Sequence, residues 1–339
     1  MNYKRLKAKR VFSGSRPTGK LHLGNYLGAI KGYLELQDDD RFDCIYSVVD
    51  LHGITTPYDP KRYQEQINDV VLDYLGCGLN PKKAHLMIQS QVREHVELAY
   101  LLGTIYPVSR LEDLPTYKEK KLENPAYINM GLLYYPVLMA ADILIYKAEV
   151  VPVGKDQLPH LEVAREIARK FNSMFPLEGS DAVVFPEPQP YLTKAAYIPS
   201  LRGSGKMSKS IEGSYIGLTD SLETIRAKLA GAPTDSGQGE KIPEEGGVAN
   251  LLNLVKLFEG EEAYKEYQNQ YLGSGIKYAD LKEKLAQAIY RQLQPIQERR
   301  AEYEKNPRLV AEILAEGRQY AQKIAAATLK EVKTCMGLV

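Results

Sequence analysis

The stretch VFSGSRPTGKLHLGNYLGAIKGYLEL, residues 11–36, contains the strongest signal for the fold of this chain. Its apolar start predicts a short strand, and Gly14, Pro17 and Gly19 mark the loop that follows. Apolar residues then recur at helical spacing over 21–36, which predicts a helix. A strand, a glycine loop and a helix N-terminus together form an anion site, because backbone N–H groups and the helix dipole point at a phosphate.

A second motif, KMSKS at 206–210, follows much later in the chain. The glycines before it predict a mobile loop, and Lys206 and Lys209 place two ammonium groups three residues apart. Such a loop suits a polyphosphate whose negative charge shifts during a reaction. In the first motif His22 and Asn25 are also three residues apart, so both side chains can face one ligand at the helix start.

Strand-like and helix-like segments alternate through the first half of the chain. Strands are predicted at 42–49 and 86–88, and helices at 60–74, capped by Asp59, and at 94–106. This alternation predicts an α/β fold with a Rossmann-like, doubly wound parallel sheet. Ligands bind beyond the carboxyl ends of such strands. His52, just past the strand at 42–49, is therefore predicted to line a pocket.

Helical spacing dominates the chain after about residue 220. We therefore expect a Rossmann-like domain over 1–218, with a connecting insertion near 108–134 and the lysine loop at 206–210. A helical domain is expected over 219–305, with a long loop at 231–247. Helices over 306–339 are expected to pack back on the first domain.

Length and composition agree with a globular protein of two domains. The 339 residues are long for one core, and 44% hydrophobic and 26% charged residues are ordinary values. The formal charge of +1 gives no electrostatic indication of nucleic-acid binding. No apolar run approaches the roughly 18 residues that span a bilayer, and the basic N-terminus leads into a strand pattern, not an apolar signal region. A cytoplasmic location is predicted.

The three cysteines, Cys44, Cys77 and Cys335, are spaced too widely for a CxxC-type metal site. An odd count with no pairing pattern suits a reducing compartment. We expect no zinc and no iron–sulfur cluster.

The two motifs, in this order and on this alternating background, resemble those of the class I aminoacyl-tRNA synthetases. His22-Leu23-Gly24-Asn25 stands where that class has His-Ile-Gly-His, and KMSKS matches its lysine loop letter for letter. The stretch YYPVLMAADILIY at 134–146, followed by VVPVGKDQLPHLEVAREIARKFN, resembles the bacterial tryptophanyl enzymes and also their relatives, the tyrosyl enzymes.

The choice between these two substrates depends on the chemistry of the pocket. Indole offers one N–H donor and no acceptor, so a tryptophan pocket needs a single acceptor among apolar or polarizable walls. Asp142 and Met139 are three apart on the predicted helix and share a face. The resemblance implies that Asp142 accepts from the indole N–H. A glutamine commonly occupies the Met139 position in tyrosyl enzymes, whereas a thioether packs well against an aromatic edge.

The remaining site residues follow from the resemblance, position by position. It implies an indole wall and contacts to the amino acid from Phe12, Gly14, His52, Tyr135, Met139, Val151, Val153 and Gln157. It implies ATP contacts from Gly14, Arg16, Thr18, Gly24, Asn25, Lys118, Lys120, Gly154, Asp156, Gln157, Lys206, Met207, Ser208 and Lys209. Asn25 departs from the second histidine of the class motif, and Arg16 stands where better-known members have glutamine.

The resemblance also implies the reaction. Tryptophan and ATP, the latter with Mg²⁺, would form tryptophanyl-AMP and pyrophosphate, with His22, Asn25, Lys206 and Lys209 as the catalytic residues. The tryptophanyl group would then pass to the terminal adenosine of tRNA(Trp), whose anticodon the helical domain would bind. A homodimer is implied, with its interface expected near 111–134.

Three alternatives remain open from the sequence. A tyrosyl enzyme would share the fold and the mechanism. Another nucleotidyl transferase with a His-x-Gly-His loop fits the first motif but not the lysine loop combined with MAADIL. A non-catalytic paralogue that binds tryptophan or RNA as a regulator would have no need for the lysines and histidines of the two motifs.

Overall fold

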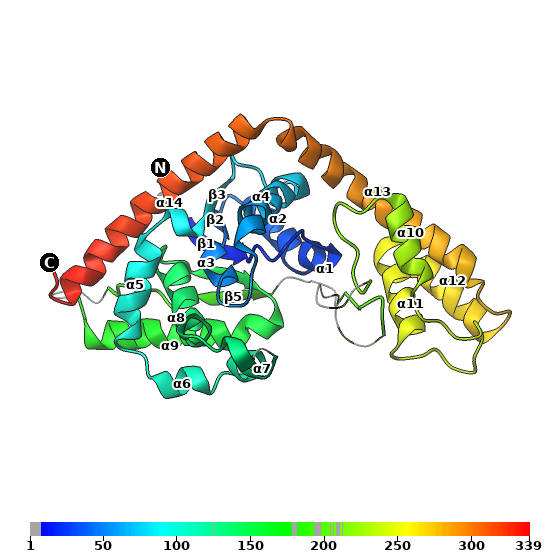
Figure 1. Ribbon diagram of the computed structural model, residues 1–339, viewed down its shortest axis with the longest axis horizontal. Helices are drawn as coiled ribbons and strands as arrows, with labels where there is room; N and C mark the ends of the chain where they lie inside the picture. The colour runs from blue at the N-terminus through cyan, green and yellow to red at the C-terminus, as the bar shows by residue number, and fades with distance from the viewer. Residues whose placement is uncertain are drawn as a thin grey trace, which may run out of the picture.

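The structure is a computed structural model of the chain, and it describes residues 8–123, 125–177, 182–192, 198–203, 205, 207, 211 and 213–339. Figure 1 shows a domain built around a sheet at one side of the molecule and a purely helical domain at the other. Two long helices, α13 (Tyr278–Glu304) and α14 (Pro307–Cys335), run along the back of both. The predicted α/β fold with a C-terminal helical region is confirmed.

The sheet has five parallel strands in the order β3-β2-β1-β4-β5. The strands are β1 (Lys9–Ser15), β2 (Phe42–Val48), β3 (Ala84–Ile88), β4 (Val150–Val153) and β5 (Gln189–Leu192). The strand order reverses between β1 and β4, and ligands bind at such a switch point, beyond the carboxyl ends of the strands. The loop after β1 carries the first motif and lies at this point.

Side chains of successive strand residues point to opposite faces of the sheet, so the core has two halves. Val11 packs in one apolar cluster with the helices that follow β1 and β2, and this cluster continues into the helical domain. Phe12 packs in the other, with α5 (Glu94–Gly103), α8 (Met130–Leu144) and α9 (Leu158–Met174). The second cluster contains Phe12, Val151 and Val153, which the resemblance assigns to the amino-acid site.

The helix predicted at 21–36 is interrupted. It consists of α1 (Leu23–Asn25), a π-helical turn η1 (Tyr26–Ile30) and α2 (Lys31–Gln37). The turn contains Gly28, and π turns within helices are frequent at functional sites.

Other helix predictions differ from the structure mainly at their ends. The Asp59 side chain accepts from the Lys61 N–H at 3.0 Å, as an N-cap should, and α4 (Pro60–Cys77) runs one turn beyond the predicted end. Helix α5 stops at Gly103, three residues earlier than predicted, and the Thr104 N–H donates to the Leu101 carbonyl at its end. The other helices are α3 (Asp50–Gly53), α6 (Val108–Glu112), α7 (Pro115–Glu123), α10 (Leu222–Ala230), α11 (Gly247–Phe258) and α12 (Glu261–Leu272).

The last helix, α14, is one continuous helix where several were predicted, and it packs along β3 and α5. A Cβ on Gly317 would lie 1.9 Å from the Leu86 carbonyl oxygen, so only glycine permits this close approach. The helix covers the edge strand of the sheet, which would otherwise present unpaired backbone groups. Within the described ranges, no helix combines the length and apolar character needed to cross a membrane.

Candidate active site

The first motif forms a compact turn at the start of α1. The His22 N–H donates to Asn25 Oδ1 at 3.1 Å, and the Asn25 N–H donates back to the His22 carbonyl at 2.9 Å. The His22 ring is buried and lies 5.5 Å from the ring of Tyr215. A Cβ on Gly24 would lie 2.8 Å from the His22 ring. The glycine is therefore required for the imidazole to fold over this turn.

Met207 and the segment that follows the second motif lie against the first motif. This segment pairs with the first motif, because the Leu23 N–H donates to the Ile216 carbonyl and the Leu218 N–H to the Leu21 carbonyl, at 2.9 and 3.0 Å. Met207, the described residue of KMSKS, is buried, and its Cβ would lie 3.5 Å from a Cβ on Gly24. Met207 thus lies beside the first motif. Lys206, Ser208 and Lys209 lie outside the described residues.

The base of the lysine loop is tied to the helical domain. Asn250 of α11 donates through Nδ2 to the Ser200 carbonyl at 2.9 Å and to the Gly203 carbonyl at 2.6 Å. The Leu201 N–H donates to the Ser214 carbonyl at 2.9 Å and closes the loop at its base. The base of the loop is thus anchored to α11.

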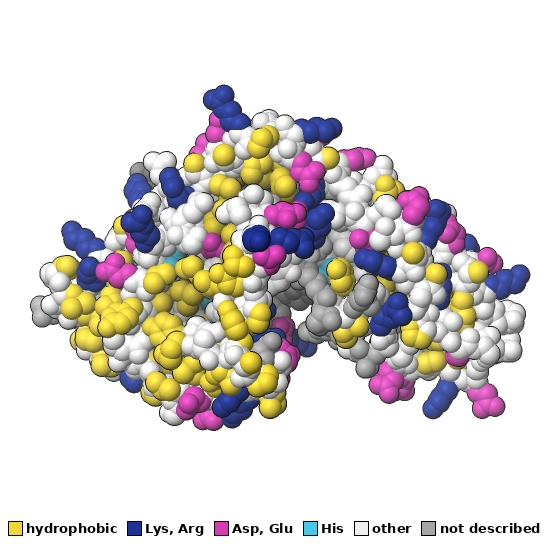
Figure 2. Space-filling model, viewed as in Figure 1, with side chains coloured by type: hydrophobic (Ala, Val, Ile, Leu, Met, Phe, Trp, Pro, Cys, Tyr) yellow, Lys and Arg dark blue, Asp and Glu magenta, His cyan; other side chains and the backbone are white. Residues whose placement is uncertain are grey.

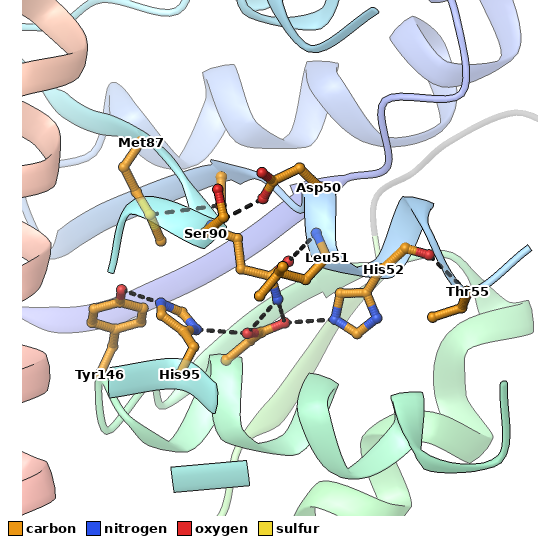
Figure 3. Close-up of polar contacts among 11 residues, drawn as sticks. Asp50, Leu51, His52, Thr55, Met87, Ser90, His95 and Tyr146 are labelled. Carbon is orange, nitrogen blue, oxygen red and sulfur yellow. Dashed lines mark hydrogen bonds and ion pairs between the residues drawn. The ribbon is translucent and has the colours of Figure 1, made fainter. Parts of the chain in front are cut away.

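Asp142 of α8 is the centre of a buried polar cluster (Figure 3). His52 Nε2 lies 2.7 Å from its Oδ2, and His95 Nδ1 lies 2.6 Å from its Oδ1. Gln89 Nε2 lies 2.7 and 2.8 Å from the two oxygens. The other ring nitrogen of His95, Nε2, lies 2.6 Å from the Tyr146 hydroxyl. The carboxylate thus receives donors from three different elements.

The electrostatics of this cluster keep Asp142 ionised. Burial by itself raises the pKa of a carboxyl group, but the hydrogen bonds from His52 and His95 outweigh it and lower the pKa of Asp142 to about 2. Burial and the nearby Asp142 charge raise the pKa of Tyr146 well above its ordinary value. The cluster therefore holds a fixed negative charge beside a protonated hydroxyl.

Apolar residues surround one side of this cluster. Phe12, Val151 and Val153 are buried in the same apolar cluster, and the partly buried Met139 packs against it. The Phe12 ring stacks on Tyr146 at 5.2 Å and 22°. The structure thus brings together the residues that the resemblance assigns to an indole wall, with one charged acceptor among them.

Tyr135 and His160 form a second polar pair near His52. The Tyr135 hydroxyl lies 2.6 Å from His160 Nε2, and the rings of His52 and Tyr135 meet edge-on at 6.3 Å. Burial raises the pKa of Tyr135 and lowers the pKa of His160, so the pair is neutral at pH 7. Gln157 Nε2 donates to Asp156 at 2.9 Å in the turn after β4.

Other residues that the resemblance assigns to ATP lie in loops and on α7. Lys118 and Lys120 of α7 form ion pairs with Asp113 at 3.1 Å and Glu123 at 2.5 Å, and Arg16 is exposed. Gly14 lies near the end of β1 and close to β2. A Cβ on Gly14 would lie 2.6 Å from the Ser47 carbonyl oxygen. Gly154 begins the turn after β4, and Thr18 is exposed in the loop after β1.

Sequence reasoning missed Gln89, His95 and Tyr146. Gln89 directly follows β3, and the rule that ligands bind beyond strand ends would have indicated it. Tyr146 lies four residues after Asp142, one helical turn away. His95 gives no local signal. In the described part of the chain, no group of three or more His, Cys, Asp or Glu side chains is arranged to hold a metal ion.

The class of the protein follows from this fold and from comparison with known families. The family model described as "tRNA synthetases class I (W and Y)" matches residues 4–294. The chain belongs to this family and is an aminoacyl-tRNA synthetase.

The relatives described below are all enzymes for tryptophan. The tryptophan–tRNA ligase of Porphyromonas gingivalis is 40% identical over 332 residues, which cover 96% of this chain and 98% of the relative. That of Caldanaerobacter subterraneus is 41% identical over 336 residues, which cover 98% and 99%. The solved structure of the tryptophanyl-tRNA synthetase from Campylobacter jejuni complexed with ADP and tryptophan superimposes with a TM-score of 0.83 at 31% identity, covering 97% of this chain and 100% of that one.

Proposed function

We propose that this chain is a tryptophan–tRNA ligase that forms tryptophanyl-AMP from L-tryptophan and ATP and then transfers the tryptophanyl group to tRNA(Trp). The observation that carries the proposal is the fixed charge of Asp142 beside an apolar wall. An indole ring needs one acceptor for its N–H and apolar surface for the remainder. The full-length similarity to tryptophan–tRNA ligases supports the same substrate.

The amino acid is held at both of its ends. Asp142 accepts from the indole N–H, while Phe12, Met139, Val151 and Val153 line the ring together with His52. Tyr135 and Gln157 bind the α-amino group, and His160 holds the Tyr135 hydroxyl at 2.6 Å. The carboxylate then projects toward the loop after β1, where the exposed Arg16 guanidinium can pair with it.

Activation is an in-line displacement at the α-phosphorus of ATP. A carboxylate oxygen of tryptophan forms a bond to this phosphorus, and the bond to the bridging oxygen breaks with its electron pair leaving on pyrophosphate. No protein nucleophile takes part, so catalysis comes from positioning and charge stabilisation. His22 and Asn25 hold the phosphates, and Lys206 and Lys209, together with the Mg²⁺ that accompanies ATP, neutralise the leaving pyrophosphate.

The remaining ATP contacts come from three loops and from α7. Gly14, Gly24 and Gly154 allow the nucleotide to approach the backbone, and Thr18, Asp156, Gln157, Met207 and Ser208 surround it. Lys118 and Lys120 reach the phosphates only after leaving Asp113 and Glu123. Both ion pairs are at least partly exposed, and such pairs cost little to break.

The active protein is a homodimer, and the helical domain binds the anticodon. Large apolar side chains are exposed along α5, α6, α7 and α8, and Figure 2 shows apolar side chains gathered over this part of the sheet domain. Val96, Tyr100, Val108, Leu122 and Met130 are each more than half exposed. A patch of this kind marks an interaction surface. The interface therefore includes the segment 111–134 and extends to α5.

The test is ATP–pyrophosphate exchange without tRNA, with tryptophan, tyrosine and phenylalanine compared. Exchange with tryptophan alone supports the proposal. Exchange with tyrosine would keep the fold and the mechanism but overturn the assignment of Asp142 and Met139. No exchange with any of the three would indicate a regulatory paralogue, and tryptophan binding measured by calorimetry would then identify its ligand.

A further inference from the structure

Asp142 is supported from behind by a pair of residues that never reach a pocket surface. His95 and Tyr146 are both fully buried, His95 on α5 and Tyr146 just after α8. Figure 3 shows Tyr146 and His95 side by side, away from His52, and His52 and His95 contact different oxygens of the Asp142 carboxylate. A line of contacts runs from the Tyr146 hydroxyl to His95 Nε2, and from His95 Nδ1 to Asp142 Oδ1, with 2.6 Å at each step.

The proton between His95 and Asp142 is determined by the carboxylate. An ionised carboxylate only accepts, so His95 Nδ1 carries the hydrogen that points at Asp142. The Tyr146 hydroxyl stays protonated because burial and the Asp142 charge raise its pKa. The Tyr146 hydroxyl lies 2.6 Å from His95 Nε2, and a hydroxyl can either donate to or accept from a ring nitrogen. Tyr146 thus fixes the orientation in which His95 Nδ1 points at Asp142.

Gln89 fixes the carboxylate from a third direction. Its Oε1 accepts from the Leu51 N–H at 3.0 Å, which turns the amide nitrogen toward Asp142. This orientation is unambiguous, because the reverse one would bring two N–H donors together at Leu51. Oδ1 is therefore held by residues of the core.

The two oxygens of Asp142 have different surroundings. Oδ2 contacts His52, which lies beside Tyr135 and so on the side of the amino-acid pocket. Oδ1 contacts His95, which lies among core residues. A carboxylate has about four acceptor positions, so Oδ2 can accept one more donor once His52 or the shared Gln89 contact yields.

We propose that His95, backed by Tyr146, is a positioning residue for tryptophan selection, because it holds Asp142 Oδ1 and so presents Oδ2 to the indole N–H. The proposal rests on the function proposed above. A preorganised acceptor stabilises only ligands that bring a donor to it. Loss of His95 should therefore weaken the binding of tryptophan more than the binding of an analogue that lacks the indole N–H.

The chain contains a second His–Tyr–Asp cluster that serves as a matched control. The rings of His85 and Tyr320 stack at 3.6 Å and 12°, and the Tyr320 hydroxyl donates to Asp43 at 2.7 Å. This cluster lies where α14 covers β3, outside the proposed pocket. Tyr320→Phe removes a hydroxyl that contacts Asp43, just as Tyr146→Phe removes one that contacts His95, but Tyr320 lies outside the proposed pocket.

The experiment measures pyrophosphate exchange with tryptophan and with the analogue in which sulfur replaces the indole N–H. We expect His95→Leu to raise KM for tryptophan roughly 30-fold, as the loss of one hydrogen bond to a charged group predicts. Tyr146→Phe should raise it about fivefold. His95→Asn keeps an N–H donor and should restore KM to within about threefold of the wild type. In these variants, KM for ATP and KM for the sulfur analogue should stay within about twofold of the wild-type values. In the Tyr320→Phe control, KM for tryptophan should also stay within about twofold.

Two results would overturn the proposal. One is an equal rise in KM for tryptophan and for the sulfur analogue, which would show a general structural role. The other is an unchanged KM for tryptophan in both His95→Leu and Tyr146→Phe, with thermal unfolding confirming that both variants are folded. Failure of the proposed function is separate, because the wild-type protein would then not exchange with tryptophan at all.

Discussion

Two aspartates, each 1% exposed, take opposite roles in this molecule. Asp142 lies in the sheet domain and accepts hydrogen bonds from His52, His95 and Gln89. Asp73 of α4 lies at the junction with the helical domain, where it contacts the Arg300 guanidinium and accepts from the Leu21 N–H at 2.8 Å. The pKa of Asp142 is lowered to about 2, whereas burial raises the pKa of Asp73 despite the contact with Arg300.

The difference shows that converging donors can lower the pKa of a buried carboxyl group, whereas a contacting guanidinium does not offset the effect of burial on the pKa of Asp73. At Asp73, burial is the largest influence on the pKa, and the nearby carboxylate of Asp69 shares the charge of Arg300. At Asp142, the donors converge on the two oxygens, and the hydrogen bonds from His52 and His95 outweigh burial. The Asp142 site is the one proposed to receive the indole donor, whereas Asp73 joins α4 to α13 through Arg300.

The largest expected effect is that of Asp142→Asn on tryptophan activation. The variant removes the charge and turns an N–H group toward donors that need an acceptor. We expect kcat/KM for tryptophan to fall about a thousandfold, with KM for ATP unchanged within about twofold. Pyrophosphate exchange at varied tryptophan concentration measures both. A small effect on kcat/KM would mean that indole binds elsewhere.

Arg300→Met should destabilise the protein without affecting tryptophan. It leaves Asp73 buried without its cation, and we expect the free energy of unfolding to fall by about 3–5 kcal/mol in urea denaturation. Arg308→Met is the control, because the Arg308–Glu312 pair on α14 is exposed, with Arg308 at 91%, and its loss should cost less than about 0.5 kcal/mol. Equal losses in the two variants would contradict a structural role for Asp73.

The two aspartates should also differ in the sign of their pH dependence. The pKa of Asp142 is lower in the folded than in the unfolded protein, so its stabilisation of about 2 kcal/mol is present above pH 4 and is lost as the pH falls toward 2. The pKa of Asp73 is raised in the folded protein, so its contribution is greatest in acid and is lost as the pH rises.

Urea denaturation between pH 7 and 3 tests this difference. The loss of stability in acid should be shallower in Asp142→Asn than in the wild-type protein and steeper in Asp73→Asn. Identical pH slopes in the two variants would show that their environments do not differ in the way described.

The smallest expected effect concerns the contact between the helical domain and the lysine loop. Asn250→Ala removes both hydrogen bonds to the loop, and we expect kcat for activation to fall about fivefold, with KM for tryptophan unchanged. Gln238→Ala is the control, because Gln238 donates to the Gly273 carbonyl at 2.6 Å within the helical domain. A similar loss of kcat in both variants would indicate a general loosening of that domain.

The sequence alone was sufficient for the fold class and for the family. Signals such as the Asp59–Pro60 helix start and the alternation of strands and helices depend on neighbours along the chain, and the structure agrees with them. The two motifs are also local, which is why the family could be identified from them and the family model confirms it. Asp142 was found in the same way, because it lies on a helix whose whole stretch resembles the family.

The tertiary structure alone decided what surrounds Asp142 and what joins the domains. His95 lies 47 positions from Asp142, and Arg300 lies 227 positions from Asp73. No periodicity or capping rule connects residues this far apart, because their contact depends on the path of the whole chain. The sequence determined which residue accepts the proposed indole N–H. The fold determined that a tyrosine and a histidine behind it hold that acceptor in place.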